Sequence, residues 1–188
     1  LRIMKIPLRS EHRHDDELHR QTRTYRRLLH AFGYPMRIQQ LEERAIHCIV
    51  DCLLDSQTTV AIEVENKELT SRILNTGATL SQTPEWVFAG SQRHHLQHIP
   101  AGSRESPESG ATLVMEIAAI SPTNGGLAIR ATGAGLNKPH TLYFSGLHQN
   151  VVIDHIAFRA DYPRGVDLLL CADTQLVVLP RHLTLEII

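Results

Sequence analysis

A glycine-rich bend with basic neighbours is the first feature of this sequence that suits a charged ligand. Gly133, Ala134 and Gly135 follow a predicted strand, with Arg130 before them and Lys138 after them. Backbone N–H groups in such a bend bind anions, and the two cations add positive charge. The complete dinucleotide fingerprint requires a third glycine where Lys138 stands, and no Walker sequence is present. The bend therefore predicts either an anion site or a plain turn between a strand and a loop.

A second charged group stands where the chain enters a fully apolar strand. Arg164 lies in the turn before that strand and Asp167 lies at its start. An aspartate in this place usually caps a turn, and a role in binding or catalysis is the alternative. No nucleophile elbow is present, so no catalytic residue is assigned. The candidate ligand site consists of six residues: Arg130, Gly133, Gly135, Lys138, Arg164 and Asp167.

Histidines are frequent, and three of them cluster at His94, His95 and His98. On a helix, His94 and His98 would share one face and suit a zinc ion. Further ligands at a familiar spacing do not follow, and neither a His-Glu-x-x-His nor a Cys-x-x-Cys motif is present. We therefore assign no metal, and we expect His12, His14 and His19 near the N-terminus to be surface residues.

The overall charge excludes one class of partner. The formal net charge is −1, whereas nucleic-acid-binding domains carry a clear basic excess. Of the basic residues 16 are arginines and only Lys5, Lys67 and Lys138 are lysines. Arginine is favoured at protein interfaces and anion sites, although genome bias produces the same excess. The sequence predicts no nucleic acid partner.

The three cysteines, Cys48, Cys52 and Cys171, are predicted to be buried apolar residues rather than a redox pair. An odd, low count fits a reducing cytoplasm. Residues 1–13 lack the apolar run of a signal peptide, and no segment approaches the roughly 20 apolar residues of a membrane span. We expect a cytoplasmic protein that does not bind a membrane.

The first predicted element is a helix over residues 16–32. A stripe at helical spacing, predicted to pack inward, consists of Leu18, Thr22, Tyr25, Leu29 and Phe32. Gly33 is predicted to take a left-handed closing conformation, and Pro35 prevents continuation. The opposite, basic face is either a solvated surface or a docking face. The candidate partner interface combines this basic face with an exposed loop at residue 104. It consists of Arg23, Arg26, Arg27 and Arg104.

The remaining pattern predicts strands mixed with helices. Helices are expected over residues 47–54, from an Asn66 cap to Gly77, and over residues 147–155. Strands are expected over residues 36–41, 60–64, 86–89, 111–120, 127–131, 166–171, 176–179 and 183–187. Residues 111–120 and 166–171 are apolar on both faces, which is typical of central strands covered on both sides. The predicted fold class is α/β, a three-layer sandwich with a mixed central sheet.

Four blocks in this order resemble the H subunit of bacterial carbon–phosphorus lyase, the PhnH family. They are residues 25–32 with Pro35, residues 109–114, residues 132–136, and residues 162–170 continuing to 179–181. The resemblance covers residue 23 to the end and predicts one domain, 23–188, after a poorly matched N-terminal arm, 1–22. The family usually has glycine after the helix-terminating proline, whereas this chain has Met36.

The resemblance implies a function in assembly. The fold would resemble the large domain of pyridoxal-phosphate-dependent transferases, without the cofactor. The family acts in the cytoplasm with the G, I and J subunits, in phosphonate catabolism. Together they form ribose 1-phosphonate 5-triphosphate from ATP and an alkylphosphonate. The resemblance therefore implies a non-catalytic subunit that forms a homodimer when isolated.

The residues permit two other functions. A pyridoxal enzyme requires a lysine for its Schiff base; Lys5 lies in the poorly matched arm, and neither Lys67 nor Lys138 stands in a recognised motif. We therefore expect no cofactor. The remaining alternative is a stand-alone protein or enzyme that binds a small anion or nucleotide at the candidate ligand site.

Overall fold

The computed structural model describes the backbone of residues 9–188 and the side chains from His19 onward. The larger of two sheets has seven strands, and its inner strands are parallel while one edge is antiparallel. This mixed sheet confirms the predicted α/β class. Its strands, in spatial order, are β1 (Gln39–Gln40), β10 (Gln175–Leu179), β9 (Asp167–Ala172), β5 (Thr112–Glu116), β4 (Trp86–Ala89), β2 (Thr59–Ile62) and β3 (Thr79–Leu80).

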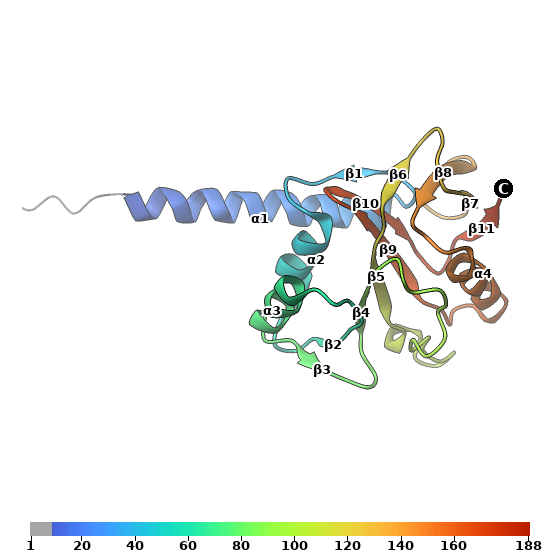
Figure 1. The fold of residues 1–188 in the computed structure, drawn as a ribbon, viewed down its shortest axis with the longest axis horizontal. Coiled ribbons are helices and arrows are strands. Elements are labelled where there is room, and N and C mark those ends of the chain that lie inside the picture. The colour runs from blue at the N-terminus through green and yellow to red at the C-terminus, as the bar shows by residue number, and fades with distance from the viewer. Residues whose placement is uncertain (1–8) are drawn as a thin grey trace, which may run out of the picture.

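Three helices cover one face of this sheet (Figure 1). They are α1 (Arg9–Gly33), α2 (Ala45–Leu53) and α3 (Lys67–Asn75). Leu28, Ile49 and Ile73 are buried from the helices, against Phe88 and Leu169 from the sheet. Asn66 caps α3 as predicted, because its side chain accepts a hydrogen bond from the Leu69 N–H at 3.1 Å. Within the described residues, no helix has both the length and the apolar character needed to cross a membrane.

The opposite face is covered mainly by a second, antiparallel sheet and by α4 (Gln149–Phe158). Phe144 and Val151 pack there against Leu113 and Leu170 of the large sheet. Two short 3-10 turns, η1 (Pro107–Ser109) and η2 (Arg159–Asp161), lie in the connecting loops. The second sheet contains, in order, β11 (Thr184–Ile187), β7 (Leu127–Thr132), β8 (His140–Ser145) and β6 (Ala119–Ser121).

The predicted strand over residues 111–120 is two strands in different sheets. The Ile117 N–H still donates to Cys171 of the large sheet at 2.8 Å, whereas the Ala118 N–H donates to Ser145 of the small sheet at 2.9 Å. The chain therefore changes sheets between these two residues. A continuous apolar run does not reveal such a change, because both sheets require apolar side chains.

The exit from α1 differs from the prediction. The left-handed conformation falls on Met36, with φ 59°, and not on Gly33. The Met36 N–H donates to the carbonyl of Val178 at 3.1 Å, and its side chain is fully buried. The turn is thus fixed by contact with β10 rather than by the end of the helix. The family's glycine at this position agrees with the conformation, because glycine takes a positive φ at no steric cost.

Candidate functional site

The predicted ligand residues lie in three places rather than one. Arg130 forms an ion pair with Glu186 across β7 and β11, at 3.4 Å. The other five fall into two groups: Gly133, Gly135 and Lys138 in the β7–β8 turn, and Arg164 and Asp167 at the entry to β9.

Asp167 is held by an arginine that the sequence analysis did not single out as a site residue. Its Oδ1 accepts from the backbone N–H of Arg181 at 2.7 Å, and its Oδ2 accepts from the guanidinium at 2.6 and 3.0 Å. The same guanidinium donates to the carbonyl of Pro107 at 2.7 Å. The two charged side chains are only 22% and 15% exposed. We call this group, Asp167 and Arg181 with Pro107 and Gly110, the buried junction.

Gly110 makes room for the buried junction. A Cβ atom at Gly110 would lie 2.6 Å from Nη1 of Arg181 and 2.8 Å from the carbonyl oxygen of Gly165. No side chain fits at these distances, so the backbone approaches the guanidinium closely only because this residue is glycine. The junction joins the loop before β5 to the start of β9 and the end of β10.

The helix α4 places His155 beside the buried junction. The residue is 3% exposed, and neither ring nitrogen has a hydrogen-bond partner among the described residues, although the Leu179 backbone lies nearby. Burial lowers the pKa of His155 to about 4, while the nearby carboxylate of Asp167 opposes this shift. The imidazole is therefore neutral at pH 7.

Arg164 belongs to a more exposed cluster. The carboxylate of Asp161 accepts from Arg164 at 2.6 Å and from Arg104 at 2.7 Å. These hydrogen bonds, first that of Arg104, lower the pKa of Asp161. Arg104, one of the predicted interface residues, is therefore engaged within the chain while its side chain stays 68% exposed.

The glycine bend packs against the exit from α1. A Cβ atom at Gly135 would lie 2.5 Å from Cδ of Pro35, and φ at Gly135 is +84°. His182 binds the bend from the other side, with Nε2 3.2 Å from the Ala134 carbonyl oxygen. Beside this contact is a hollow of about 330 Å³. The residues that line it, which we call the basic hollow, are Arg37, Gly135, Leu136, Asn137, Lys138 and His140.

Ion pairs occupy the edge of the sheet where α/β proteins usually bind ligands, at the carboxyl ends of the parallel strands. Glu116, at the end of β5, pairs with Arg44, and this hydrogen bond raises the pKa of the arginine. Glu63, after β2, pairs with Arg93. Arg93 also donates to the carbonyls of His95 at 2.8 Å and Gln97 at 2.9 Å. The charges at this edge are thus used to hold loops.

The clustered histidines bind the same loop to α4. His95 Nδ1 lies 3.2 Å from Asp154, and His95 Nε2 lies 3.1 Å from the side-chain amide of Asn150. His94 stacks on His148 with ring centroids 4.2 Å apart. Along the described part of the chain, no three metal-binding side chains gather at one point.

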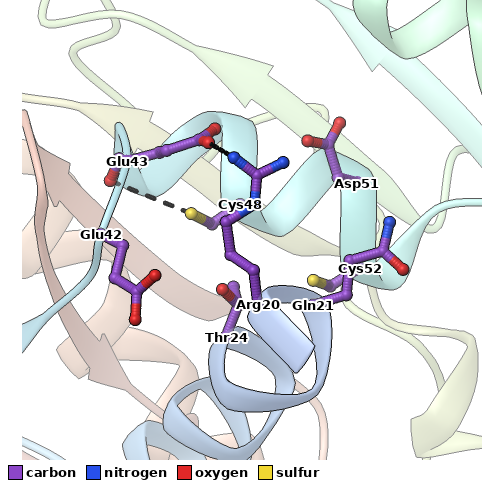
Figure 2. A pocket seen from close by; sticks show the side chains of 8 residues that line it. All are labelled: Arg20, Gln21, Thr24, Glu42, Glu43, Cys48, Asp51 and Cys52. Carbon is purple, nitrogen blue, oxygen red and sulfur yellow. Dashed lines mark hydrogen bonds and ion pairs between the residues drawn. The ribbon is translucent and has the colours of Figure 1, made fainter. Parts of the chain in front are cut away.

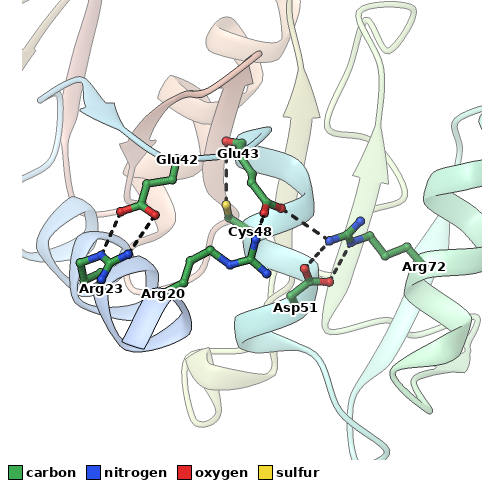
Figure 3. A network of polar contacts seen from close by, with 7 residues as sticks. All are labelled: Arg20, Arg23, Glu42, Glu43, Cys48, Asp51 and Arg72. Carbon is green, nitrogen blue, oxygen red and sulfur yellow. Dashed lines mark hydrogen bonds and ion pairs between the residues drawn. The ribbon is translucent and has the colours of Figure 1, made fainter. Parts of the chain in front are cut away.

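Arginines of α1 hold the base of this helix on the α2 side, as Figure 3 shows. Arg23 forms two hydrogen bonds with Glu42, at 3.0 and 3.3 Å, and Arg20 pairs with Glu43. Arg72 of α3 reaches the same group through Asp51, at 2.8 Å. We call these residues the α1 network. Two predicted interface residues thus have partners within the chain, Arg23 here and Arg27 at the Gln40 carbonyl, whereas Arg26 is exposed.

A small cavity of about 30 Å³ lies under this network (Figure 2). It has room for about one water molecule. Cys48 and Cys52 line it, and burial raises the pKa of both thiols, that of Cys48 to about 11. Cys48 and Cys171 are buried, as predicted, and Cys52 is half-buried. Neutral thiols of this kind are poor nucleophiles, so the cavity does not assemble cysteine chemistry.

A family model described as "Bacterial phosphonate metabolism protein (PhnH)" matches residues 12–186. The chain belongs to the PhnH family. A putative C-P lyase subunit, HtxG of Stutzerimonas stutzeri, is 32% identical over 174 residues, which is 89% of this chain and 87% of that protein. The alpha-D-ribose 1-methylphosphonate 5-triphosphate synthase subunit PhnH of Rhizobium meliloti (strain 1021) is 31% identical over 117 residues, 60% of this chain and 57% of that protein.

The four blocks that resemble the PhnH family meet at two contacts. The blocks around Gly110, Asp167 and Arg181 form the buried junction. The helix block ends at Pro35, which lies against Gly135 of the glycine block. The ordered set therefore marks places where distant segments approach closely, and this explains the glycines and the buried charges within it.

The stripe of α1 faces outward, contrary to the prediction. Tyr25, Leu29 and Phe32 are 46%, 53% and 36% exposed, whereas Leu28 and Ala31 are buried. Leu18 belonged to the predicted stripe and lies outside the described side chains. Hydrophobic spacing identifies residues that share a face of a helix, but it does not say which face packs. We call Tyr25, Leu29 and Phe32 the outer stripe.

Proposed function

We propose that this protein is a non-catalytic subunit of the complex that forms ribose 1-phosphonate 5-triphosphate from ATP and an alkylphosphonate. Its proposed partners are the G, I and J subunits of carbon–phosphorus lyase, in the cytoplasm. The outer stripe of α1 is the observation that carries the proposal. The name of the Rhizobium relative, a synthase subunit, supports the same assignment.

The outer stripe has the form of a docking surface. Tyr25, Leu29 and Phe32 stand at i, i+4 and i+7 and so lie along one line of the helix. The N-terminal part of the helix projects well beyond the sheets (Figure 1), and the outer stripe, nearer its C-terminal end, is exposed to solvent and open to a partner. A groove of about 280 Å³, lined by Tyr25, Thr22 and Cys52 among others, lies beside it. An amphipathic helix with such anchors binds in an apolar groove of its partner.

The basic residues around the outer stripe indicate the charge that the partner surface carries at its rim. Arg26 is exposed, and no ion pair involves it within the described residues. Arg23, Arg27 and Arg104 keep part of their surface exposed while bound within the chain. We therefore propose a partner with an apolar groove and an acidic rim, in which Arg26 makes the new contact.

We extend the same proposal to the domain extent, the fold and the oligomeric state. We infer one domain over residues 23–188, with the mixed sheet corresponding to the large domain of pyridoxal-phosphate-dependent transferases, without the cofactor. Lys67 begins α3 and Lys138 is exposed in the β7–β8 turn, so neither lies within the core. We also propose that the isolated subunit forms a homodimer through the outer stripe, which would be released when the partners bind.

Co-expression with the G, I and J subunits tests the proposal. We expect the wild-type chain to co-purify with them and a Leu29→Glu variant to be lost from the complex. Leu74→Glu is the matched control, because Leu74 is a 44% exposed leucine on α3. Circular dichroism of both variants establishes that they fold. Retention of a folded Leu29→Glu variant at wild-type yield would refute the docking surface, and failure of the wild-type chain to co-purify would refute the assignment.

A further inference from the structure

We propose that the basic hollow is a binding site for a phosphate-type oxyanion, either a polyphosphate chain or a phosphonate. This site belongs to the isolated chain. It extends the proposed function, because the proposed complex acts on both kinds of anion. Arg37, Lys138 and His140 line the hollow, and no carboxylate lines it. We assign Arg37 and Lys138 as the principal ligands.

The charge of the hollow is unusual in this protein. Most arginines with described side chains are paired with a carboxylate, as in Arg44–Glu116 and Arg181–Asp167. Among the residues that the structure describes, neither Arg37 nor Lys138 takes part in an ion pair. The guanidinium of Arg37 instead lies over the ring of Tyr34, 5.0 Å from its centroid. In a chain of net charge −1, two free cations in one hollow leave a local site for an anion.

The backbone brings these two cations together. Arg37 follows the buried, left-handed Met36, whose N–H is bound to Val178. Lys138 follows the glycine bend, and the bend contacts Pro35 at Gly135. Any side chain at Gly135 would push the two loops apart, because its Cβ atom would lie 2.5 Å from Pro35. The close contact thus sets the separation of the two cations.

Two backbone donors of the residues that line the hollow are available to an anion. In the described structure the N–H groups of Asn137 and Lys138 donate to no acceptor within the chain. Such amides in a turn bind anionic oxygens, as they do in phosphate-binding loops. Arginine contributes a planar fork that matches two oxygens of a phosphate or phosphonate, and lysine contributes a compact charge. A tetrahedral oxyanion with several oxygens is the ligand that uses this set fully.

Calorimetry and thermal unfolding of the purified full-length chain test the site, with tripolyphosphate, methylphosphonate and inorganic phosphate as separate probes at constant ionic strength. A ligand that binds the native state raises its melting temperature. We expect Arg37→Ala and Lys138→Ala each to weaken binding about tenfold, the value for loss of one charged hydrogen bond. Arg159→Ala is the control, because it removes the same charge from an exposed arginine that also lies over a tyrosine ring, that of Tyr162, and does not line the hollow. Tighter binding of tripolyphosphate would identify a polyphosphate ligand, and tighter binding of methylphosphonate a phosphonate.

Two results would overturn the site. One is the absence of both heat and thermal stabilisation with all three probes. The other is an equal loss of affinity in Arg159→Ala, which would mean that the anions bind the net charge of the chain. The outcome is separable from assembly, because the Arg37→Ala/Lys138→Ala double variant is expected to co-purify with the partner subunits whether or not the anion binds.

Discussion

The buried junction and the α1 network use the same chemistry in different surroundings. Both join arginine to carboxylate across segments far apart in the sequence. The side chains of Asp167 and Arg181 are largely enclosed, Asp167 also accepts from a backbone N–H and Arg181 also donates to a backbone carbonyl, whereas Arg23 is 54% exposed. Ion pairs in water contribute little to stability, while a buried charge without its partner is costly. The buried junction therefore fixes the framework, and the α1 network only holds the base of α1.

The difference agrees with the functions proposed for the two regions. The buried junction joins the segments that the PhnH family blocks mark, and it exposes little surface to a partner. The α1 network holds a helix whose outer stripe remains uncovered. A weakly held helix is able to adjust its position when a partner covers the stripe.

The largest effect is expected at the buried junction. Asp167→Ala leaves the guanidinium of Arg181 without its carboxylate, and we expect a loss of about 3–4 kcal/mol in the free energy of unfolding. Urea denaturation measures it. Glu186→Ala is the control, because it breaks the exposed pair with Arg130. Equal, small losses in both variants would show that the junction is no more structural than a surface pair.

Because His155 is buried beside the junction, we expect the stability of the folded chain to be sensitive to acid. Its pKa is about 4 in the folded chain and about 6.5 when unfolded, so only the unfolded state binds a proton between these values. Stability from this group is complete above pH 6.5 and is lost as the pH falls toward 4, by about 3 kcal/mol. We expect His155→Leu to flatten this part of the stability curve. Urea titrations at pH 7 and pH 4.5 compare the variant with the wild type, and parallel curves would contradict the prediction.

Met36 tests whether the exit from α1 belongs to the rigid framework. Met36→Ala and Met36→Gly both remove the buried side chain, but only glycine relieves the left-handed backbone. We expect the glycine variant to be more stable than the alanine variant by about 1 kcal/mol. Thermal unfolding of the pair isolates the backbone contribution. An alanine variant of equal or greater stability would mean that Met36 does not hold this conformation.

The smallest effect is expected in the α1 network. Arg72→Gln removes the ion pair with Asp51, in which both side chains are about one-third exposed. We expect a loss of no more than about 0.5–1 kcal/mol in the free energy of unfolding. Urea denaturation in low and high salt checks this, since salt should reduce the difference between variant and wild type. A loss as large as that of Asp167→Ala would remove the distinction between the two regions.

Local features of the fold could be predicted from the sequence. The strand β4 and the Asn66 cap of α3 are confirmed, because a short apolar run and a helix cap depend on residues close together in the chain. The strand β8 was missed, although buried Leu142 and Phe144 alternate with half-buried residues in the way that is typical of a strand. The inward assignment of the stripe containing Leu29 was wrong. Tertiary contacts decide which face of a helix packs, and here the smaller Ala31 is buried.

The candidate site could be predicted only in part, for a similar reason. Gly135 and Lys138 were recognised because they form one short motif. Arg37 was not recognised, because it lies at the hollow only as a result of the contact between Pro35 and the glycine bend. Arg181 was likewise missed as the partner of Asp167. Contacts between distant segments leave no spacing pattern in a single sequence.

Amide hydrogen exchange over residues 21–32 of α1, in the isolated chain and in the complex with the G, I and J subunits, tests whether the outer stripe is the docking surface. We expect strong additional protection of this segment in the complex relative to the isolated chain at a concentration low enough to dissociate the homodimer, while the strands that meet at the buried junction exchange equally slowly in both states. Unchanged exchange along α1, in a complex that has formed, would contradict the assignment of the outer stripe as the docking surface.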